Sequence, residues 1–301
     1  MNILSEFSLG PKTTPKIVWY LMVITCVVAL LSATIQILFD FFELHPGPQD
    51  LFCLYWSGMK KGYLWQPITY LFVENHSDPL SLPYLTSLFF SIYILWVLGA
   101  AVLEVIEERF FLPLYLISGA LSGIIALLTM PLSYDHYIVL TGLTAPLLTF
   151  FIIWGMALPE IDILLFFLIP VKIKWFVVTS VSLILLFKLF QQNLPSFTLS
   201  LSAIATGYLY AACFMGWHSP FPYTQRFDRW ITAKSLHLSN YLPNWLRIQP
   251  IKQKNINGNT EQMSDDAFVD AMLEKISKEG ENSLSWAEKQ RFQKISDKKL
   301  F

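Results

Sequence analysis

Long apolar segments without charged side chains fill much of this chain. The first runs from Ile17 to Phe39 and contains no Asp, Glu, Lys or Arg. An α-helix needs about 20 mostly apolar residues to cross the hydrocarbon core of a bilayer, so this segment predicts a membrane span. It is too long for the apolar part of a signal peptide, and we expect it to be retained. Four more spans are predicted at Tyr84–Leu103, Phe110–Leu132, Tyr137–Leu158 and Phe197–Trp217.

One further apolar segment, Ile163 to Phe190, is interrupted by Pro170, Lys172 and Lys174. We interpret it as a short interfacial piece followed by a span that begins at about Trp175. Six spans result. The predicted fold class is therefore an all-α polytopic membrane protein built as a bundle of six transmembrane helices.

The charged residues are few and unevenly placed. They make up 14% of the chain, whereas soluble domains carry roughly 25%. Residues 1–219 hold 8 Lys and Arg and 12 Asp and Glu, and residues 220–301 hold 13 and 10. This distribution excludes a soluble enzyme and predicts a membrane domain with a polar tail. The net charge of −1 gives no basic surface for nucleic acid, which we do not expect as a partner.

Basic residues also predict the orientation in the membrane. An even number of spans places both termini on one side, and short cytoplasmic loops carry the excess of Lys and Arg. The opposite side has only Lys60 and Lys61, so we expect cytoplasmic N- and C-termini. The residues that fall together on the cytoplasmic side are Lys12, Lys16, Arg109, Lys172, Lys174, Arg226 and Arg229.

The first outer loop, residues 40–83, is long and rich in aromatic side chains. Trp and Tyr are favoured at the depth of the lipid headgroups. We therefore expect short amphipathic pieces in the outer membrane interface. The loop includes Phe41, Phe42, Phe52, Tyr55, Trp56, Tyr63 and Trp65.

Four regions follow from these patterns: an N-terminal cytoplasmic segment (1–16), the membrane domain (17–217), a linker (218–263) and a cytoplasmic two-helix tail (264–301). In the tail, Ser264 can cap a helix that Gly280 ends, and Phe268 and Met272 lie on one face of it. Ser285 and Glu288 form a capping box for a second helix.

Five short motifs, in order, resemble those of the rhomboid superfamily of intramembrane proteins. The resemblance covers roughly residues 15–217 and implies the rhomboid-like bundle. The tail resembles the cytoplasmic tail of some bacterial rhomboid-like proteins, which implies a bacterial inner membrane. The motifs are Leu64–Phe72, Trp96–Gly99 with Glu104, Arg109–Gly119, Gly142–Ala145 and Leu199–Tyr208.

The resemblance also implies where catalytic groups would lie. Active rhomboids use a Ser on the fourth span and a His on the sixth, because a hydroxyl needs an adjacent base to become a nucleophile. Here these positions hold Thr144 and Ser200. Neither hydroxyl accepts a proton near pH 7, so we expect no catalytic dyad.

Other parts of the family's site also differ. The oxyanion-binding positions on the second span are Ser87 and Ser91, whose side chains are short. The fourth-span motif keeps its first glycine as Gly142. The position of the family's second glycine holds Ala145. The loop Arg is replaced by Gln66.

A histidine elsewhere in the chain could substitute as the base. None falls inside a predicted span, and His76 and His136 are the two nearest to the expected site on the outer side. The five histidines are His45, His76, His136, His218 and His237.

Small residues remain at helical spacing on two spans, Ala203 with Gly207 and Gly119 with Gly123, where they permit close helix packing. No cofactor motif or metal cluster is present. Cys26, Cys53 and Cys213 are too few and too far apart for a disulfide framework, and none stands beside a His or a second Cys at metal-ligand spacing. We therefore expect no cofactor and no bound metal.

Three functional hypotheses follow. The first is a pseudoprotease that binds transmembrane segments of other membrane proteins in the lipid bilayer, with its tail open to a cytoplasmic partner. The second is an active intramembrane endopeptidase of the serine type that uses Thr144 as an atypical nucleophile. The third is a small-solute transporter or channel. Ion pathways usually need charged groups inside the membrane, and the spans offer only Lys188.

Overall fold

The chain divides into two compact units, Met1–Ile251 and Lys252–Phe301. The computed structural model describes residues 11, 14–43, 46–74, 80–133, 138–165, 169–215, 217, 219, 221, 224, 265–279, 292 and 295. The first unit carries all the membrane-spanning helices that the structure describes.

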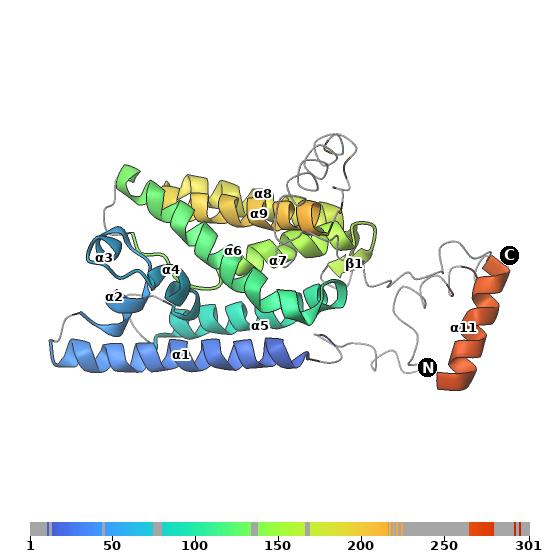
Figure 1. Ribbon diagram of the computed structural model, residues 1–301, viewed down its shortest axis with the longest axis horizontal. Helices are drawn as coiled ribbons and strands as arrows, with labels where there is room; N and C mark the ends of the chain where they lie inside the picture. Colours follow the sequence, from blue (N-terminus) through green and yellow to red (C-terminus); the bar gives the residue numbers. More distant parts are fainter. Residues whose placement is uncertain are drawn as a thin grey trace, which may run out of the picture. The chain divides into compact units, whose positions relative to one another are not determined.

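Five helices of the first unit are long and apolar enough to cross a membrane. Many of their large apolar side chains point outward, among them Trp19 and Leu183, as lipid-facing side chains do. In Figure 1, α1 lies along α5 on one side of the bundle, and α8 and α9 lie on the other. The five helices are α1 (Lys16–Phe41), α5 (Leu82–Val105), α6 (Glu108–Thr129, extended by the 3₁₀ turn η3, Met130–Leu132), α8 (Ile173–Phe190) and α9 (Leu194–Phe214).

Two of these helices, α5 and α9, begin with a side-chain N-cap followed by a proline. The Ser81 side chain accepts a hydrogen bond from the Tyr84 N–H at the start of α5 (3.5 Å), and Asn193 caps the Ser196 N–H of α9 (3.0 Å). Each cap is followed by a proline in the first turn, where a missing N–H costs nothing. Sequence alone therefore sets where α5 and α9 begin.

The central helix of the bundle is α7 (Thr144–Ala157). Ten of its 14 residues are buried, and it packs against α5, α6, α8 and α9. Its core contact with α6 is a pair of aromatic rings, Phe111 and Phe150, with centroids 4.8 Å apart. Fourteen residues give a helix about 21 Å long, which is shorter than a hydrocarbon core of about 30 Å.

The predicted span Tyr137–Leu158 is wrong before Thr144. Leu140 is held in an antiparallel bridge with Leu54, with N···O distances of 2.9 and 3.0 Å. Gly142 follows with a φ of +84°, which a right-handed helix does not allow. The apolar sequence continues through this stretch, but its backbone hydrogen bonds go to a partner far away in the chain.

Between α1 and α5 the structure describes four short helical pieces. We call residues 46–74 the connecting layer; it contains α2 (Pro48–Phe52), α3 (Trp56–Lys60), α4 (Gln66–Thr69) and η2 (Tyr70–Phe72). The Trp65 Nε1–H donates to the Leu51 carbonyl, and the Thr69 hydroxyl donates to that of Phe52, both at 2.9 Å. These bonds fold the aromatic loop onto itself.

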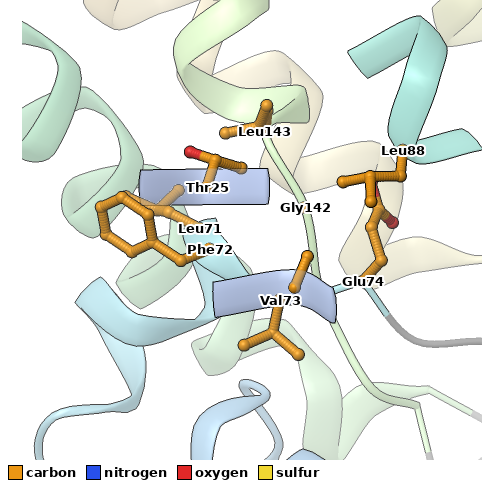
Figure 2. Close-up of a pocket in the computed structure, with 9 residues that line it drawn as sticks. Thr25, Leu71, Phe72, Val73, Glu74, Leu88, Gly142 and Leu143 are labelled. Atoms are coloured by element: carbon orange, nitrogen blue, oxygen red, sulfur yellow. The ribbon is translucent and has the colours of Figure 1, made fainter. Parts of the chain in front are cut away.

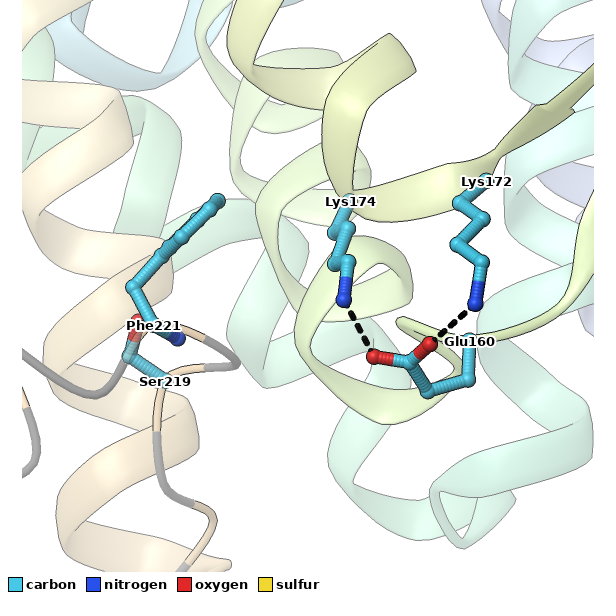
Figure 3. Close-up of polar contacts among 5 residues, drawn as sticks. All are labelled: Glu160, Lys172, Lys174, Ser219 and Phe221. Carbon is cyan, nitrogen blue, oxygen red and sulfur yellow. Dashed lines mark hydrogen bonds and ion pairs between the residues drawn. The ribbon is translucent and has the colours of Figure 1, made fainter.

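A β-hairpin joins α7 to α8, and the all-α prediction misses it. β1 (Asp162–Leu165) pairs antiparallel with β2 (Ile169–Lys172). At its base, Glu160 forms ion pairs with Lys172 (2.6 Å) and Lys174 (Figure 3). The expected interfacial piece is therefore a pair of strands.

The second unit contains α11 (Asp265–Glu279). Phe268 and Met272 are buried on one face of α11 and form a cluster with Ile295. Most of the expected linker, residues 218–263, and of the expected second tail helix lies outside the described residues.

Candidate functional site

The turn before α7 is fixed by backbone hydrogen bonds to the connecting layer. The Gly142 N–H donates to the carbonyl oxygens of Tyr70 and Val73, both at 2.9 Å. Its φ of +84° lies in the left-handed region, which favours glycine. These contacts set the position of Thr144, the first residue of α7, relative to the connecting layer.

Thr144 stands at the start of the central helix. It is half-buried, and its hydroxyl makes no hydrogen bond to any residue in the described part of the chain. Ala145 and Pro146, the next two residues, are buried. Thr144 is thus the polar residue at the end of α7 that follows the turn bonded to the connecting layer.

Ser200 lies on the neighbouring helix α9 and is fully buried. Its hydroxyl donates to the Ser196 carbonyl of its own helix (3.0 Å). α7 and α9 pack along each other, and the Thr149 hydroxyl donates to the Ala203 carbonyl (3.0 Å). The structure therefore brings the helices of Thr144 and Ser200 together without a hydrogen bond between the two hydroxyls.

Ser91 on α5 meets a carboxyl group that the sequence analysis missed. The Ser91 hydroxyl donates to Glu74 Oε1 (3.2 Å), and Glu74 is only 9% exposed. Ser87, one helical turn earlier on α5, is half-buried. An acidic residue two positions after the segment Leu64–Phe72 was the signal that could have marked Glu74.

The Glu74 carboxyl also lies against the turn before α7. A Cβ atom added to Gly142 would lie 3.2 Å from Glu74 Oε1 and 3.3 Å from Oε2. Figure 2 shows Glu74 beside Gly142 and Leu88. One side chain thus links the connecting layer, α5 and the turn that precedes Thr144.

Glu74 lines a small and mostly apolar pocket (Figure 2). The lining side chains leave no space for a molecule the size of water. The pocket lies between α1, the connecting layer, α5 and the turn before α7. Its lining residues are Thr25, Ala29, Leu71, Phe72, Val73, Glu74, Leu88, Gly142 and Leu143.

The small residues expected to permit close packing do so in two places, between α7 and α9 and between α6 and the connecting layer. A Cβ at Gly207 would lie 2.8 Å from the Thr149 carbonyl oxygen, so α9 and α7 approach backbone to backbone beside Ala203. Gly119 and Gly123 on α6 face the connecting layer: an added Cβ would lie 2.6 Å from Leu71 Cδ1 and 2.9 Å from Tyr70 Cε1 respectively.

Tyr70 holds the connecting layer on α6. Its ring is fully buried, and its hydroxyl donates to the Gly119 carbonyl at 2.8 Å. Burial raises the pKa of the Tyr70 phenol, so the hydroxyl stays protonated and keeps this donor role.

All five histidines, His76 and His136 among them, lie outside the described residues. Within the described ranges, no three His, Cys, Asp or Glu side chains gather closely enough to hold a metal ion.

Residues 61–217, just over half of the chain, match the Rhomboid domain. The long apolar helices and this match together define a multi-pass integral membrane protein. The chain belongs to the rhomboid superfamily. No curated protein matches it closely.

Proposed function

We propose that this rhomboid-family protein is a pseudoprotease that binds transmembrane segments of other membrane proteins without cleaving them. The observation that carries the proposal is the state of the dyad positions. Ser200 is fully buried and its hydroxyl donates to its own helix, whereas the Thr144 hydroxyl makes no hydrogen bond to a base among the described residues. A hydroxyl without a base is a weak nucleophile.

The Glu74 contact supports the same proposal. An oxyanion-binding group must offer a hydrogen-bond donor to the charge that develops on the substrate. The only O–H of Ser91 donates to Glu74 Oε1 instead. A carboxyl oxygen therefore takes the donor that an oxyanion would need.

The proposed partner is a helix in the bilayer beside α7, reached between α5 and α8. α7 packs against both helices and is too short to fill the full thickness of the hydrocarbon core. A client segment with small or polar residues would bind there. We further propose that both termini are cytoplasmic, that the membrane is a bacterial inner membrane, and that the tail can dock a cytoplasmic partner.

A cleavage assay separates binding from proteolysis. The wild-type protein and Thr144→Ala are reconstituted with a transmembrane substrate whose helix is weakened by Gly and Pro. We expect no cleavage by either protein. Turnover by the wild type that Thr144→Ala abolishes would refute the pseudoprotease.

Photocrosslinking tests the binding half of the proposal. A photoreactive residue replaces Ser87 on α5, and a matched control replaces Leu121, which is exposed on α6. We expect membrane proteins to be captured from native membranes at position 87 in excess over position 121. Equal capture at both positions would show only random contact in the lipid and would contradict a dedicated binding site.

The alternative is an active protease, and one observation favours it. The Thr144 hydroxyl makes no hydrogen bond to the described residues, so none of them occupies its donor. Ser200, a water or a loop histidine would assist it, and His76 and His136 are the histidines nearest to the expected site. If one of these histidines is the base, His76→Ala or His136→Ala would abolish the same turnover as Thr144→Ala.

A further inference from the structure

The hairpin between α7 and α8 is attached directly to a membrane helix. β1 and β2 pair in a register that sets Asp162 opposite Lys172 at one end and Leu165 opposite Ile169 at the other. Lys172 ends β2 and is also the N-cap of α8. The Ile173 N–H donates to the Ile161 carbonyl (2.9 Å), which closes the base of the hairpin against the start of α8.

The hairpin sequence is apolar on both faces. Nine successive residues from Ile163 to Val171 carry no charged or hydrogen-bonding side chain. Successive side chains of a strand point to opposite faces, so the sequence between Asp162 and Lys172 provides no polar side chain for either face of the strands. Two strands alone cannot bury two apolar faces. Pro170 is exposed, and Ile163 and Val171 are only half-buried.

Charged and aromatic groups gather at the base of the same hairpin. Glu160 binds both Lys172 and Lys174, and all three lie where β2 meets α8 (Figure 3). Trp175, the next residue, is 55% exposed and makes an edge-on ring contact with Phe221 at 5.7 Å. Lys and Trp side chains at the end of a membrane helix are typical of the headgroup region.

We propose that this hairpin is a membrane-interface anchor: its apolar strands insert at the boundary between headgroups and acyl chains, on the membrane face where α8 begins. The bilayer is favoured over a protein partner for two reasons. The hairpin is joined to α8 without an intervening residue, and the side chains at its base are of the kinds found at the depth of lipid headgroups. The anchor holds the α7–α8 connection at the lipid surface.

The open edges of the two strands set the depth of insertion. Each strand of a two-stranded hairpin leaves one row of backbone N–H and C=O groups unpaired, and such groups are not tolerated in the hydrocarbon core. At the interface, water and headgroups satisfy these groups while the apolar side chains reach the acyl chains. The hairpin therefore lies shallow and does not span the membrane.

Spin-label accessibility in liposomes tests the anchor. Cys26, Cys53 and Cys213 are replaced by Ala, and single cysteines are introduced as Ile163→Cys and Pro170→Cys. Leu183→Cys, 65% exposed on α8, reports the hydrocarbon, and Glu108→Cys, at the charged start of α6, reports water. The labels are read with oxygen, which concentrates in lipid, and a water-soluble nickel chelate.

We expect the labels at 163 and 170 to be at least fivefold less accessible to the chelate than the label at 108, and less accessible to oxygen than that at 183. Both hairpin positions should give a similar depth, because both faces contact lipid. Chelate accessibility equal to that at 108 would overturn the proposal, since the hairpin would lie in water. Protection from both reagents would also overturn it, since a second copy, the tail or another protein would then cover the strands.

Discussion

Gly142 combines two constraints on one residue, a left-handed backbone and a carboxyl group beside its Cα. An L-residue in the left-handed region costs about 1–2 kcal/mol. A Cβ would also lie 3.2 Å from Glu74 Oε1. We expect Gly142→Ala to lower the free energy of unfolding by about 2–4 kcal/mol, because the close contact between the new Cβ and Glu74 adds to the conformational cost. Thermal unfolding in detergent micelles measures this loss.

Gly62 is a matched control for that substitution. It also has a positive φ, +95°, but an added Cβ would meet nothing within 4 Å. Gly62→Ala should show the conformational cost alone. Adding Glu74→Ala to Gly142→Ala should recover the difference between the two glycine variants. If Gly62→Ala and Gly142→Ala lower the free energy of unfolding equally, the Glu74 carboxyl does not crowd a Cβ at position 142.

The dyad and oxyanion positions could be named from the sequence because each belongs to a short motif with a fixed place on a span. What the sequence could not show is what each hydroxyl binds. Ser91 donates to Glu74, which is 17 positions away, and Ser200 donates to its own helix. Such choices depend on packing between elements, and no local pattern encodes them.

At the scale of elements, the contact between α7 and α9 rests on a hydrogen bond that crosses between two helices. The Thr149 hydroxyl donates to the Ala203 carbonyl, and both residues are fully buried. Thr149→Val keeps the shape and removes the donor. Interhelical hydrogen bonds in membranes contribute about 0.6 kcal/mol on average and up to about 1.7. We expect a loss within this range in thermal unfolding.

Thr206→Val on α9 is the control for the loss of a hydroxyl. The Thr206 hydroxyl donates only to the Ser202 carbonyl of its own helix at 2.8 Å. Its removal should change the unfolding temperature less than Thr149→Val does. The reverse order would mean that α7 and α9 are held by close packing at Gly207 without help from this bond.

The ion pairs at the hairpin base give this element a defined pH dependence. Hydrogen bonds from Lys172 and then Lys174 lower the pKa of the Glu160 carboxyl from 4.5 to about 2. A lowered pKa stabilises the folded form above the unfolded value of 4.5, and this contribution is lost as the pH falls through about 2. The hairpin base should therefore be unchanged between pH 7 and pH 5.

The carboxyl carbon shift of Glu160, in a protein labelled at glutamate, follows this titration. Glu160→Gln assigns the signal. Lys172→Gln and Lys174→Gln should each raise the Glu160 pKa, and the double variant should return it toward 4.5. A midpoint near 4.5 in the wild type would contradict the paired geometry.

Long helices were predictable because an uncharged segment of about 20 residues has one stable conformation in lipid, a helix that satisfies its own backbone. Shorter apolar segments were not, because apolar length alone does not separate a strand from a helix. Residues 138–143 are not helical, because Leu140 pairs with Leu54, and residues 162–165 and 169–172 form strands. Both errors fall where backbone hydrogen bonds leave the local segment.

At the scale of the whole membrane unit, three contacts fix the directions of the helices. Thr129 at the end of α6 meets Thr198 at the start of α9, with 2.8 Å between their hydroxyl oxygens. Trp96 on α5 donates to Thr14, just before α1 (2.8 Å). Trp175 at the start of α8 contacts Phe221, which follows α9. From these contacts we predict that the short helix α7 runs from one membrane face to the other.

Labelling from one side of the membrane tests this consequence for α7. In a protein without native cysteines, Ser57→Cys lies in the connecting layer, Gln192→Cys lies between α8 and α9, and Glu108→Cys starts α6; all three positions are exposed. We expect a membrane-impermeant maleimide to label 57 and 192 from the same face and 108 from the other. If α7 enters the membrane and returns, α8 starts on the opposite face and 192 is labelled together with 108. That result would contradict the packing of α9 against α6, because Thr198 could not then lie beside Thr129.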